Sequence, residues 1–286
     1  MTIKVLALNG SIRKNGNSEI LLKEALMGAE AEGAEVEILR LTDYEIGPCR
    51  GCGLCLFRDN VCQVEDGTSE IFAKVAASDG IILGAPCYFL ELTAVVKQLI
   101  DRCWILGHNN VGKPRKPASV IVPYATRGWI PYIFMQANIL FSVMNLSKIN
   151  QAAICTQGIS EVVLDRDALD LAHRMGREIA VAIKEKDLAY KGEEGICPYC
   201  NDWLLRVLRD RETIECPTCG MRGKLRIIEG KLKIEFEEKD RKDLRYREDV
   251  VYNHFTYHIA PSKDYFVRSK EERKMKTQKY KEYLPQ

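Results

Sequence analysis

The sequence has little excess charge, no long apolar run and few histidines. Its 286 residues carry 42 Lys and Arg against 40 Asp and Glu, a formal net charge of +2, with 4 His. This balance argues against a partner recognised by charge alone, such as nucleic acid or an acidic membrane surface. No stretch approaches the roughly 20 apolar residues of a membrane span. The N-terminal residues turn polar too soon for a signal peptide. We therefore expect a cytoplasmic protein with no membrane partner.

Cysteine, by contrast, is abundant. The chain has 11 cysteines, and a reducing compartment keeps them from forming disulfides. Eight of them form two compact groups of four, the number of thiolates that a tetrahedral metal ion or a cubane iron–sulfur cluster takes. The first group is Cys49, Cys52, Cys55 and Cys62, and the second is Cys197, Cys200, Cys216 and Cys219. We therefore expect two metal centres.

Short apolar runs alternate with helical patterns over the first 190 residues. The runs lie at residues 3–8, 36–41, 80–85, 118–122 and 149–155. They lack polar alternation, as is typical of parallel strands buried on both faces. Helical patterns lie between and after them, at residues 18–31, 69–77, 91–106, 132–144 and 165–186. This order predicts an α/β domain over residues 1–190, with a five-stranded parallel sheet and helices on both faces.

The composition changes after this domain. A linker at residues 191–195 opens a segment, residues 191–238, that holds two Cys-x-x-Cys turns and strand-like stretches at 204–208, 225–228 and 232–236. The last residues, 239–286, form a tail with 13 Lys and Arg, 8 Asp and Glu and several aromatic side chains. We expect this tail to dock on the core, a neighbouring subunit or an acidic partner, or to remain a solvated, partly helical arm.

A loop rich in glycine and polar residues joins the first strand to the first helix, and it reads Asn-Gly-Ser-Ile-Arg-Lys-Asn-Gly-Asn-Ser at residues 9–18. The free N–H groups and the positive dipole end of a helix attract phosphate. Ser11, Asn17 and Ser18 can add hydrogen bonds, and Arg13 a charge. The loop matches neither the GxGxxG nor the GxxxxGK[ST] pattern, so a terminal monophosphate fits it better than a dinucleotide or a nucleoside triphosphate. The simpler interpretation, a helix cap alone, leaves the other donors unexplained.

Two further loops are expected at the same edge of the sheet, where open α/β sheets bind ligands. Residues 84–89 and 124–129 follow the third and fourth strands. They contain Tyr88, Phe89 and Trp129, whose rings suit stacking on a flat aromatic ligand. Plain packing of the helix starts is the alternative interpretation.

Three short patterns together resemble the NADPH-dependent FMN reductase branch of the flavodoxin-like superfamily, over about residues 1–187. They are Gly10-Ser11-x-Arg13 with Asn17-Ser18, then Gly84-x-Pro86-x-Tyr88, then Lys97 with Asp101-Arg102. The resemblance implies that Ser11, Arg13, Asn17 and Ser18 hold the FMN phosphate, with NAD(P)H as a possible electron donor. The residues that would flank the isoalloxazine are Pro86, Cys87, Tyr88 and Phe89 on one loop and Ala125, Thr126, Arg127 and Gly128 on the other. We assign Lys97, Asp101 and Arg102 to packing and subunit contact.

The first cysteine group lies in a loop, residues 47–65, with the spacing Cys-x2-Cys-x2-Cys-x6-Cys. Three close cysteines can wrap one face of a cubane and the fourth can close it. Gly47, Gly51 and Gly53 relieve crowding around such a core. We favour a 4Fe–4S cluster over zinc or no metal. The motif on this fold resembles the iron–sulfur flavoproteins, which implies a homo-oligomer, a dimer or tetramer, with the cluster near a neighbouring subunit's flavin.

The second cysteine group pairs Cys-Pro-Tyr-Cys with Cys-Pro-Thr-Cys-Gly fifteen residues later. Paired Cys-x-x-Cys turns flanked by short strands resemble a zinc ribbon. The same turn occurs in rubredoxins, so one mononuclear iron is the alternative to zinc. A segment this short cannot bury enough apolar surface alone, so the metal is expected to supply its folding energy.

These features predict an FMN-dependent oxidoreductase. It would move electrons between NAD(P)H or a ferredoxin-like carrier, FMN and a 4Fe–4S cluster, and deliver them to a small-molecule or protein acceptor. The alternative is a cluster-free NAD(P)H-dependent FMN or quinone reductase. A third interpretation is a redox-sensing module that binds nucleic acid, but the ribbon lacks a basic stripe with interleaved aromatics.

Overall fold

The computed structural model describes residues 2–57, 62–106, 110, 112–192, 197–237, 239, 241 and 244–283. Its centre is a five-stranded sheet in the order β2-β1-β3-β6-β7, with every neighbouring pair parallel. The strands are β1 (Lys4–Asn9), β2 (Glu35–Arg40), β3 (Gly80–Gly84), β6 (Lys116–Tyr124) and β7 (Leu146–Cys155). This confirms the predicted flavodoxin-like sheet. The strand order reverses direction between β1 and β3, which is where ligands bind in such sheets.

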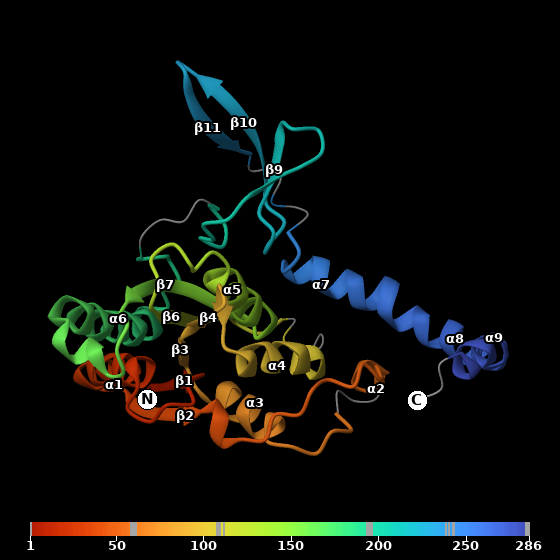
Figure 1. Ribbon diagram of the computed structural model, residues 1–286, viewed down its shortest axis with the longest axis horizontal. Coiled ribbons are helices and arrows are strands. Elements are labelled where there is room, and N and C mark those ends of the chain that lie inside the picture. The colour runs from red at the N-terminus through yellow and green to blue at the C-terminus, as the bar shows by residue number, and fades with distance from the viewer. Residues whose placement is uncertain are drawn as a thin grey trace.

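Helices cover both faces of the sheet (Figure 1). α1 (Asn17–Ala31) and α6 (Arg166–Glu185) pack on one face and bury one apolar cluster. α3 (Thr68–Ala77), α4 (Ala94–Arg102) and α5 (Ile133–Val143) pack on the other and bury the second. The central strands β1, β3 and β6 contribute side chains to both clusters, so each is almost wholly buried, as their unbroken apolar runs predicted.

Short elements in the connections differ from the sequence-based expectation. The helix expected over residues 91–106 is shorter, because residues before it form a small antiparallel hairpin of β4 (Cys87–Tyr88) and β5 (Glu91–Leu92). It also ends at Arg102 and passes into η2 (Cys103–Ile105). The other short turns are η1 (Leu41–Asp43), α2 (Leu54–Phe57) and η3 (Glu161–Leu164).

A small antiparallel sheet follows the α/β domain. Its strands run in the order β11-β10-β9-β8. They are β8 (Arg206–Val207), β9 (Thr213–Glu215), β10 (Arg222–Ile228) and β11 (Lys231–Phe236). The β10–β11 hairpin projects away from the parallel sheet at the top of Figure 1. This confirms a small, cysteine-bearing β segment at the place the sequence predicted, which we call the ribbon, residues 197–237.

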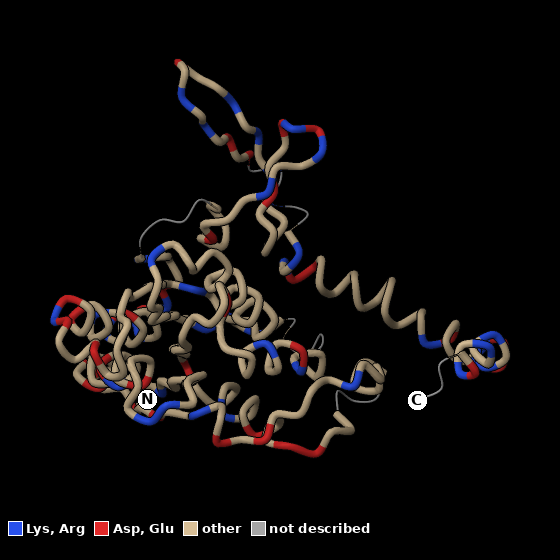
Figure 2. Tube along the Cα trace, in the orientation of Figure 1, with Lys and Arg blue, Asp and Glu red and all other residues tan. Residues whose placement is uncertain are grey.

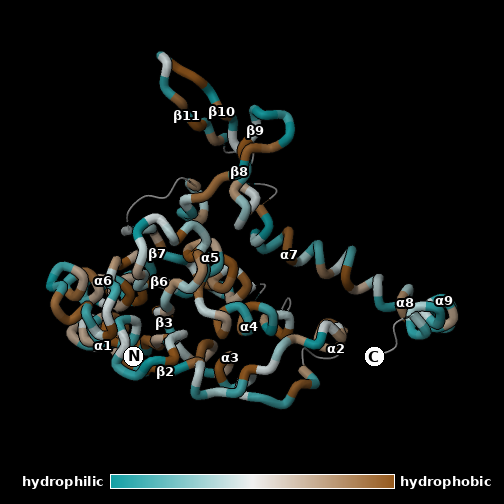
Figure 3. The backbone as a smooth tube through the Cα atoms, viewed as in Figure 1, coloured by the Kyte–Doolittle hydropathy of each residue, from teal (hydrophilic) through white to brown (hydrophobic). Residues whose placement is uncertain are grey.

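The chain ends in a helical arm, residues 248–282. It consists of α7 (Glu248–His254), the π-helical turn η5 (Phe255–Ile259), α8 (Ala260–Arg268) and α9 (Lys270–Glu282). The arm leaves the ribbon and extends to the right in Figure 1. Figure 3 shows hydrophobic residues recurring along α7 and α8 outside the main domain, and Tyr257, Tyr265 and Phe266 are all exposed. Figure 2 shows Lys and Arg gathered in α9 and in the β10–β11 hairpin. Among the helices described, none has the length and apolar character to cross a membrane.

Candidate functional site: a phosphate cradle, a thiolate loop and a metal ribbon

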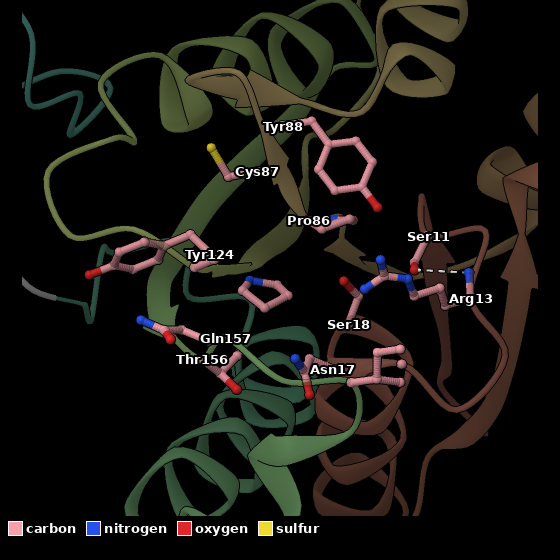
Figure 4. Close-up of a pocket in the computed structure, with 14 residues that line it drawn as sticks. Ser11, Arg13, Asn17, Ser18, Pro86, Cys87, Tyr88, Tyr124, Thr156 and Gln157 are labelled. Atoms are coloured by element: carbon pink, nitrogen blue, oxygen red, sulfur yellow. Dashed lines mark hydrogen bonds between the residues drawn. The ribbon is translucent and has the colours of Figure 1, made fainter.

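A pocket opens at the carboxyl edge of the sheet, beside the point where the strand order reverses. Figure 4 shows Ser11, Arg13 and Ser18 on one side of it, Tyr124 and Gln157 on the other, and Pro86 between them. The lining residues are Ser11, Arg13, Gly16, Asn17, Ser18, Pro86, Cys87, Tyr88, Pro123, Tyr124, Ala125, Thr156, Gln157 and Ile159. The structure therefore brings the predicted phosphate loop and parts of both predicted ring-flanking loops around one hollow.

The β1–α1 loop has unused donors that fit a phosphate. Ser11 is buried, its N–H donates to Asn9 Oδ1 at 2.9 Å, and its Oγ accepts the Arg13 N–H at 3.3 Å. α1 begins after Gly16 with no side-chain cap. The hydroxyl of Ser18 is buried and finds no hydrogen-bond partner among the described atoms. An uncapped helix N-terminus beside an unpaired buried hydroxyl is what a bound anion would satisfy.

Two residues that sequence reasoning missed hold the phosphate loop in shape. Arg40, at the end of β2, pairs with Glu19 through Nη1 and Oε2 at 2.6 Å, and its Nη2 donates to the Ile12 carbonyl at 2.9 Å. Glu19 Oε2 also accepts the Asn15 N–H at 3.0 Å. Burial opposes charge on Glu19, yet hydrogen bonds from Lys23 and Asn15 hold its pKa below the ordinary value. No local pattern reveals this brace, because Glu19 and Arg40 lie on different elements.

A third wall of the pocket comes from the segment after β7, which the sequence did not single out. Asn17 serves this wall, since its Nδ2 donates to the Gly158 carbonyl at 2.8 Å and its Oδ1 accepts the Val162 N–H at 3.2 Å. The Ser160 hydroxyl donates to the Asn15 carbonyl at 2.6 Å. Both polar atoms of the Asn17 side chain therefore bind the segment after β7, and its backbone N–H is the group that lies at the start of α1. Thr156, Gln157 and Ile159 line this wall and follow the last strand of the sheet. Their position directly after a strand is the sequence feature from which a role in the site could have been inferred.

The β4–β5 hairpin forms one wall of the pocket. Pro86, Cys87 and Tyr88 line the pocket, whereas Phe89 lies outside it and is 93% exposed. Phe89 and Leu90 have φ values of 47° and 74°, a left-handed backbone that bulky residues rarely adopt. Such strain persists only where surrounding contacts impose it, and it gathers at functional sites.

Fewer residues of the loop after β6 line the pocket than the sequence predicted. Ala125 lines the pocket together with Pro123 and Tyr124, the last residues of the strand. The predicted Thr126, Arg127 and Gly128 are not among the lining residues. The next turn carries Trp129, which is 61% exposed and accepts a hydrogen bond on its carbonyl from the Cys87 thiol at 3.3 Å. This bond joins the two loops that flank the pocket.

The first cysteine loop presents four free thiols. Cys49 and Cys52 are exposed, and Cys55 and Cys62 are partly buried. Gly51 and Gly53 lie between the cysteines with φ values of 64° and 69°, where only glycine turns without strain. Burial and the neighbouring charges of Cys62, Cys52 and Cys49 raise the pKa of the Cys55 thiol. The donor set and the glycine turns fit a thiolate-held cluster.

The three residues of α4 that match the family pattern differ in exposure: Lys97 and Asp101 lie on the helix surface, whereas Arg102 is buried. Lys97 Nζ and Asp101 Oδ1 form an ion pair of 2.6 Å on the helix surface. Arg102 is only 1% exposed and lies inside the subunit. A role for Arg102 in subunit contact therefore does not fit the structure, because its side chain does not reach the surface.

The second cysteine group forms a compact four-sulfur site. The sulfurs of Cys197, Cys200, Cys216 and Cys219 all lie within 4.8 Å of one another, and no other such group of three or more candidate ligands occurs in the described ranges. The Cys197–Cys219 and Cys200–Cys216 sulfur pairs are both 3.6 Å apart. Zinc–sulfur bonds of about 2.3 Å in a tetrahedron place sulfurs about 3.8 Å apart. The spacing therefore suits one tetrahedral ion.

The ribbon packs on the α/β domain at the start of α5 and on β7. Trp203 stacks on Phe134 with ring centroids 4.5 Å apart, and its Nε1 donates to the Pro131 carbonyl at 3.1 Å. Lys148 Nζ, on β7, donates to the Asn201 carbonyl at 3.2 Å, and burial lowers the pKa of Lys148 to about 8. The segment that follows the first Cys-x-x-Cys turn therefore packs against the start of α5, after the loop that carries Trp129.

A family model and individual relatives place the chain among the same group of proteins. A model of the NADPH-dependent FMN reductase family matches residues 3–153. An iron-sulfur flavoprotein of Methanocaldococcus jannaschii is 42% identical over 100 residues, which cover 35% of this chain and 51% of that protein. An iron-sulfur flavoprotein of Archaeoglobus fulgidus is 31% identical over 184 residues, covering 64% of this chain and 82% of that protein. The match thus spans about half the length of the first relative and four fifths of the second.

A solved structure shares the whole architecture. The structure titled flavone reductase superposes with a TM-score of 0.81 over 99% of both chains, at 21% sequence identity. At this identity the likeness concerns the fold, and it extends through the ribbon and the arm because it covers nearly the full length of both chains.

Proposed function

Because this chain belongs to the NADPH-dependent FMN reductase family, within its iron–sulfur flavoproteins, we propose that it passes electrons between NAD(P)H or a ferredoxin-like carrier, FMN and a 4Fe–4S cluster. An FMN-dependent redox function follows from the family alone. The route through a cluster, the donor and the acceptor are the parts that the proposal adds.

The observation that carries the proposal is the unsatisfied cradle at the start of α1. The buried Ser18 hydroxyl, the free N–H groups of the first helical turn and the Arg13 side chain would hold the phosphate of FMN. Pro86, Tyr88 and Tyr124 would border its ring. When bound, FMN supplies a group that takes two electrons as hydride and releases them singly. The chain's own residues position the ring and exclude water from one side of it.

The first cysteine group would hold the cluster. Its loop follows β2, so it emerges from the same edge of the sheet as the phosphate cradle. A carrier of single electrons beside a flavin suits a protein that takes electrons in pairs and delivers them one at a time. We propose further that the chain forms a homo-oligomer, since the arm, the β4–β5 hairpin and η3 expose the large apolar side chains of Tyr257, Phe89 and Leu164.

The test is an absorption spectrum with iron and acid-labile sulfide analysis on protein purified without air. The proposal expects flavin bands, a broad shoulder that dithionite bleaches, and four iron and four sulfide per chain at the first cysteine group. Flavin without sulfide would favour the cluster-free reductase. Colourless protein that does not bind added FMN would overturn both.

Replacing Arg13 with alanine is expected to weaken FMN binding about 10- to 100-fold. The reason is that a charge-assisted hydrogen bond contributes about 1.5–3 kcal/mol. Riboflavin, which lacks the phosphate, should bind both proteins alike. Quenching of flavin fluorescence on titration measures both affinities. Lys14→Ala is the matched control, because Lys14 is an exposed neighbour outside the pocket lining. Equal losses for FMN and riboflavin would contradict a phosphate role for Arg13.

A planar aromatic acceptor is a second candidate for the reaction. Phe89 and Trp129 are exposed on two loops that the Cys87–Trp129 hydrogen bond joins next to the lining residues, which suits stacking on a flat, weakly polar molecule. The solved structure with the same architecture is that of a flavone reductase. Anaerobic assay of flavone and of a simple quinone, each with the protein reduced in advance, separates the two acceptors. Phe89→Ala should slow only the acceptor that stacks there.

A further inference from the structure

A buried arginine lies beneath the first cysteine loop. Arg102, the last residue of α4, is 1% exposed and has the largest side chain among those fully buried in the described residues. Its partner Asp66 has a side chain that is 2% exposed, and the carboxylate pairs with the two terminal nitrogens of the guanidinium, Nη1 and Nη2. Burying two charges costs desolvation free energy even when they pair, and apolar side chains of similar size could fill the same space.

The ion pair joins the two ends of the cysteine loop. Asp66 Oδ2 accepts the Gly47 N–H at 2.8 Å, and Arg102 Nη1 donates to the Gly47 carbonyl at 2.9 Å. On the other side, Asp66 Oδ1 accepts the Thr68 N–H at 3.0 Å, and Arg102 Nη2 lies 3.4 Å from the Val64 carbonyl. Gly47 precedes the first ligand and Val64 follows the last. The pair therefore sets the distance between the two stems of the loop.

The guanidinium also reaches one ligand directly. Arg102 Nη2 donates to the sulfur of Cys62 at 3.3 Å, and the Val64 N–H donates to the same sulfur at 3.4 Å. Two N–H groups, one of them cationic, therefore fix the direction in which the Cys62 sulfur points. Among the described residues, Arg102 makes this contact with Cys62 and with none of the other three thiols of the group.

We propose that Arg102 is the positioning residue of the cluster, fixing the Cys62 thiolate and stabilising the more negative, reduced state of the metal centre. This rests on the proposed function, which places the cluster at these four cysteines. Hydrogen bonds to ligand sulfurs and nearby positive charge both tune the potential of iron–sulfur centres. Arg102 is not among the residues that line the pocket at the sheet edge, so it acts on the cysteine loop, through Cys62 and the two loop stems.

Two variants test the inference on anaerobically purified holoprotein. Arg102→Lys keeps the charge but lacks the fork that spans Asp66, Gly47 and Cys62. Arg102→Met combined with Asp66→Asn removes the charge without stranding its partner, so the fold is expected to survive. The readouts are iron and sulfide per chain and the midpoint potential from a titration followed by electron paramagnetic resonance. Lys97→Gln, an exposed change on the same helix, is the control.

We expect the Met–Asn double variant to bind the cluster about tenfold or more weakly, as loss of a ligand-orienting partner does, and to show a lower midpoint potential in the fraction that is loaded. Arg102→Lys should fall between it and the wild type, and Lys97→Gln should match the wild type. Full loading and an unchanged potential in both Arg102 variants would overturn the inference while the proposed function stands. Wild-type protein without iron would instead remove the proposed function, and this inference with it. Binding of FMN by the variants shows that the domain has folded.

Discussion

Cys216→Ser is expected to release the ion from the second cysteine group and to unfold the ribbon. The buried cluster of the ribbon consists of three of the ligands, Cys197, Cys216 and Cys219, with Met221 and Leu244. So small a core cannot offset the entropy of ordering the segment. A structural zinc ion contributes roughly 10–16 kcal/mol in zinc-finger peptides, so its loss should decide the fold. Metal analysis and limited proteolysis around residues 197–237 would show both effects.

The rest of the molecule provides the controls for this prediction. The α/β domain should stay folded and keep FMN, because its two apolar clusters do not depend on the ribbon. Trp203 should move into water as it leaves Phe134, with a red-shifted emission. Cys155→Ser, a thiol outside both groups, should change neither property. A Cys216→Ser protein that resists protease like the wild type would show that the ribbon folds by its own packing. The metal analysis also distinguishes zinc from a mononuclear iron.

Gly176→Ala is expected to destabilise the α/β domain by about 3 kcal/mol or more, since overpacking of this kind forces backbone apart. α1 and α6 cross with their backbones in contact. A Cβ at Gly176 would lie 1.7 Å from the Ala25 carbonyl oxygen, and one at Gly28 would lie 2.0 Å from that of His173. Neither neighbour can turn aside, because both atoms belong to backbone. Urea or thermal unfolding of the purified variant measures the loss.

The predicted change in the free energy of unfolding has the opposite sign to that of an ordinary glycine-to-alanine change in a helix. In a helix whose glycine faced solvent, alanine would stabilise by about 1 kcal/mol. Arg174→Ala on the exposed side of α6 is the control and should shift stability by no more than about 0.5 kcal/mol. The Gly176→Ala variant should also bind FMN more weakly, because displacing α1 moves the helix start that carries Ser18. A stabilised Gly176→Ala protein would mean that the two helices do not touch here.

Sequence reasoning located the parts of the site that lie next to one another along the chain. The donors at Ser11, Arg13 and Ser18 follow a strand directly, so their shared position at the pocket could be inferred from the order of residues alone. Pro86, Cys87 and Tyr88 were inferred on the same ground. Thr156 and Gln157 were missed because their segment carries no glycine-rich or aromatic signature, although it too follows a strand.

Residues that act across elements could not be inferred in this way. Arg40 and Glu19 brace the phosphate loop from a strand and a helix, and Arg102 reaches the cysteine loop from α4. A charged residue in a helix is usually solvated, so nothing local indicates that this one is buried. The β4–β5 hairpin was missed for a similar reason, because Phe89 and Leu90 adopt backbone angles that their own preferences oppose.

The sequence by itself determined the order of strands and helices, the phosphate loop and the two sets of four thiols, since these depend on periodicity and on spacing within short segments. Only the tertiary structure decided which side chains meet. It brought the second set of sulfurs within 4.8 Å of one another, packed Trp203 of the ribbon against the start of α5 and placed Arg102 against Cys62. The physical reason is range: helix and strand patterns are set by neighbours along the chain, whereas burial, ion pairing and the contact at Gly176 are set by packing between segments far apart in sequence.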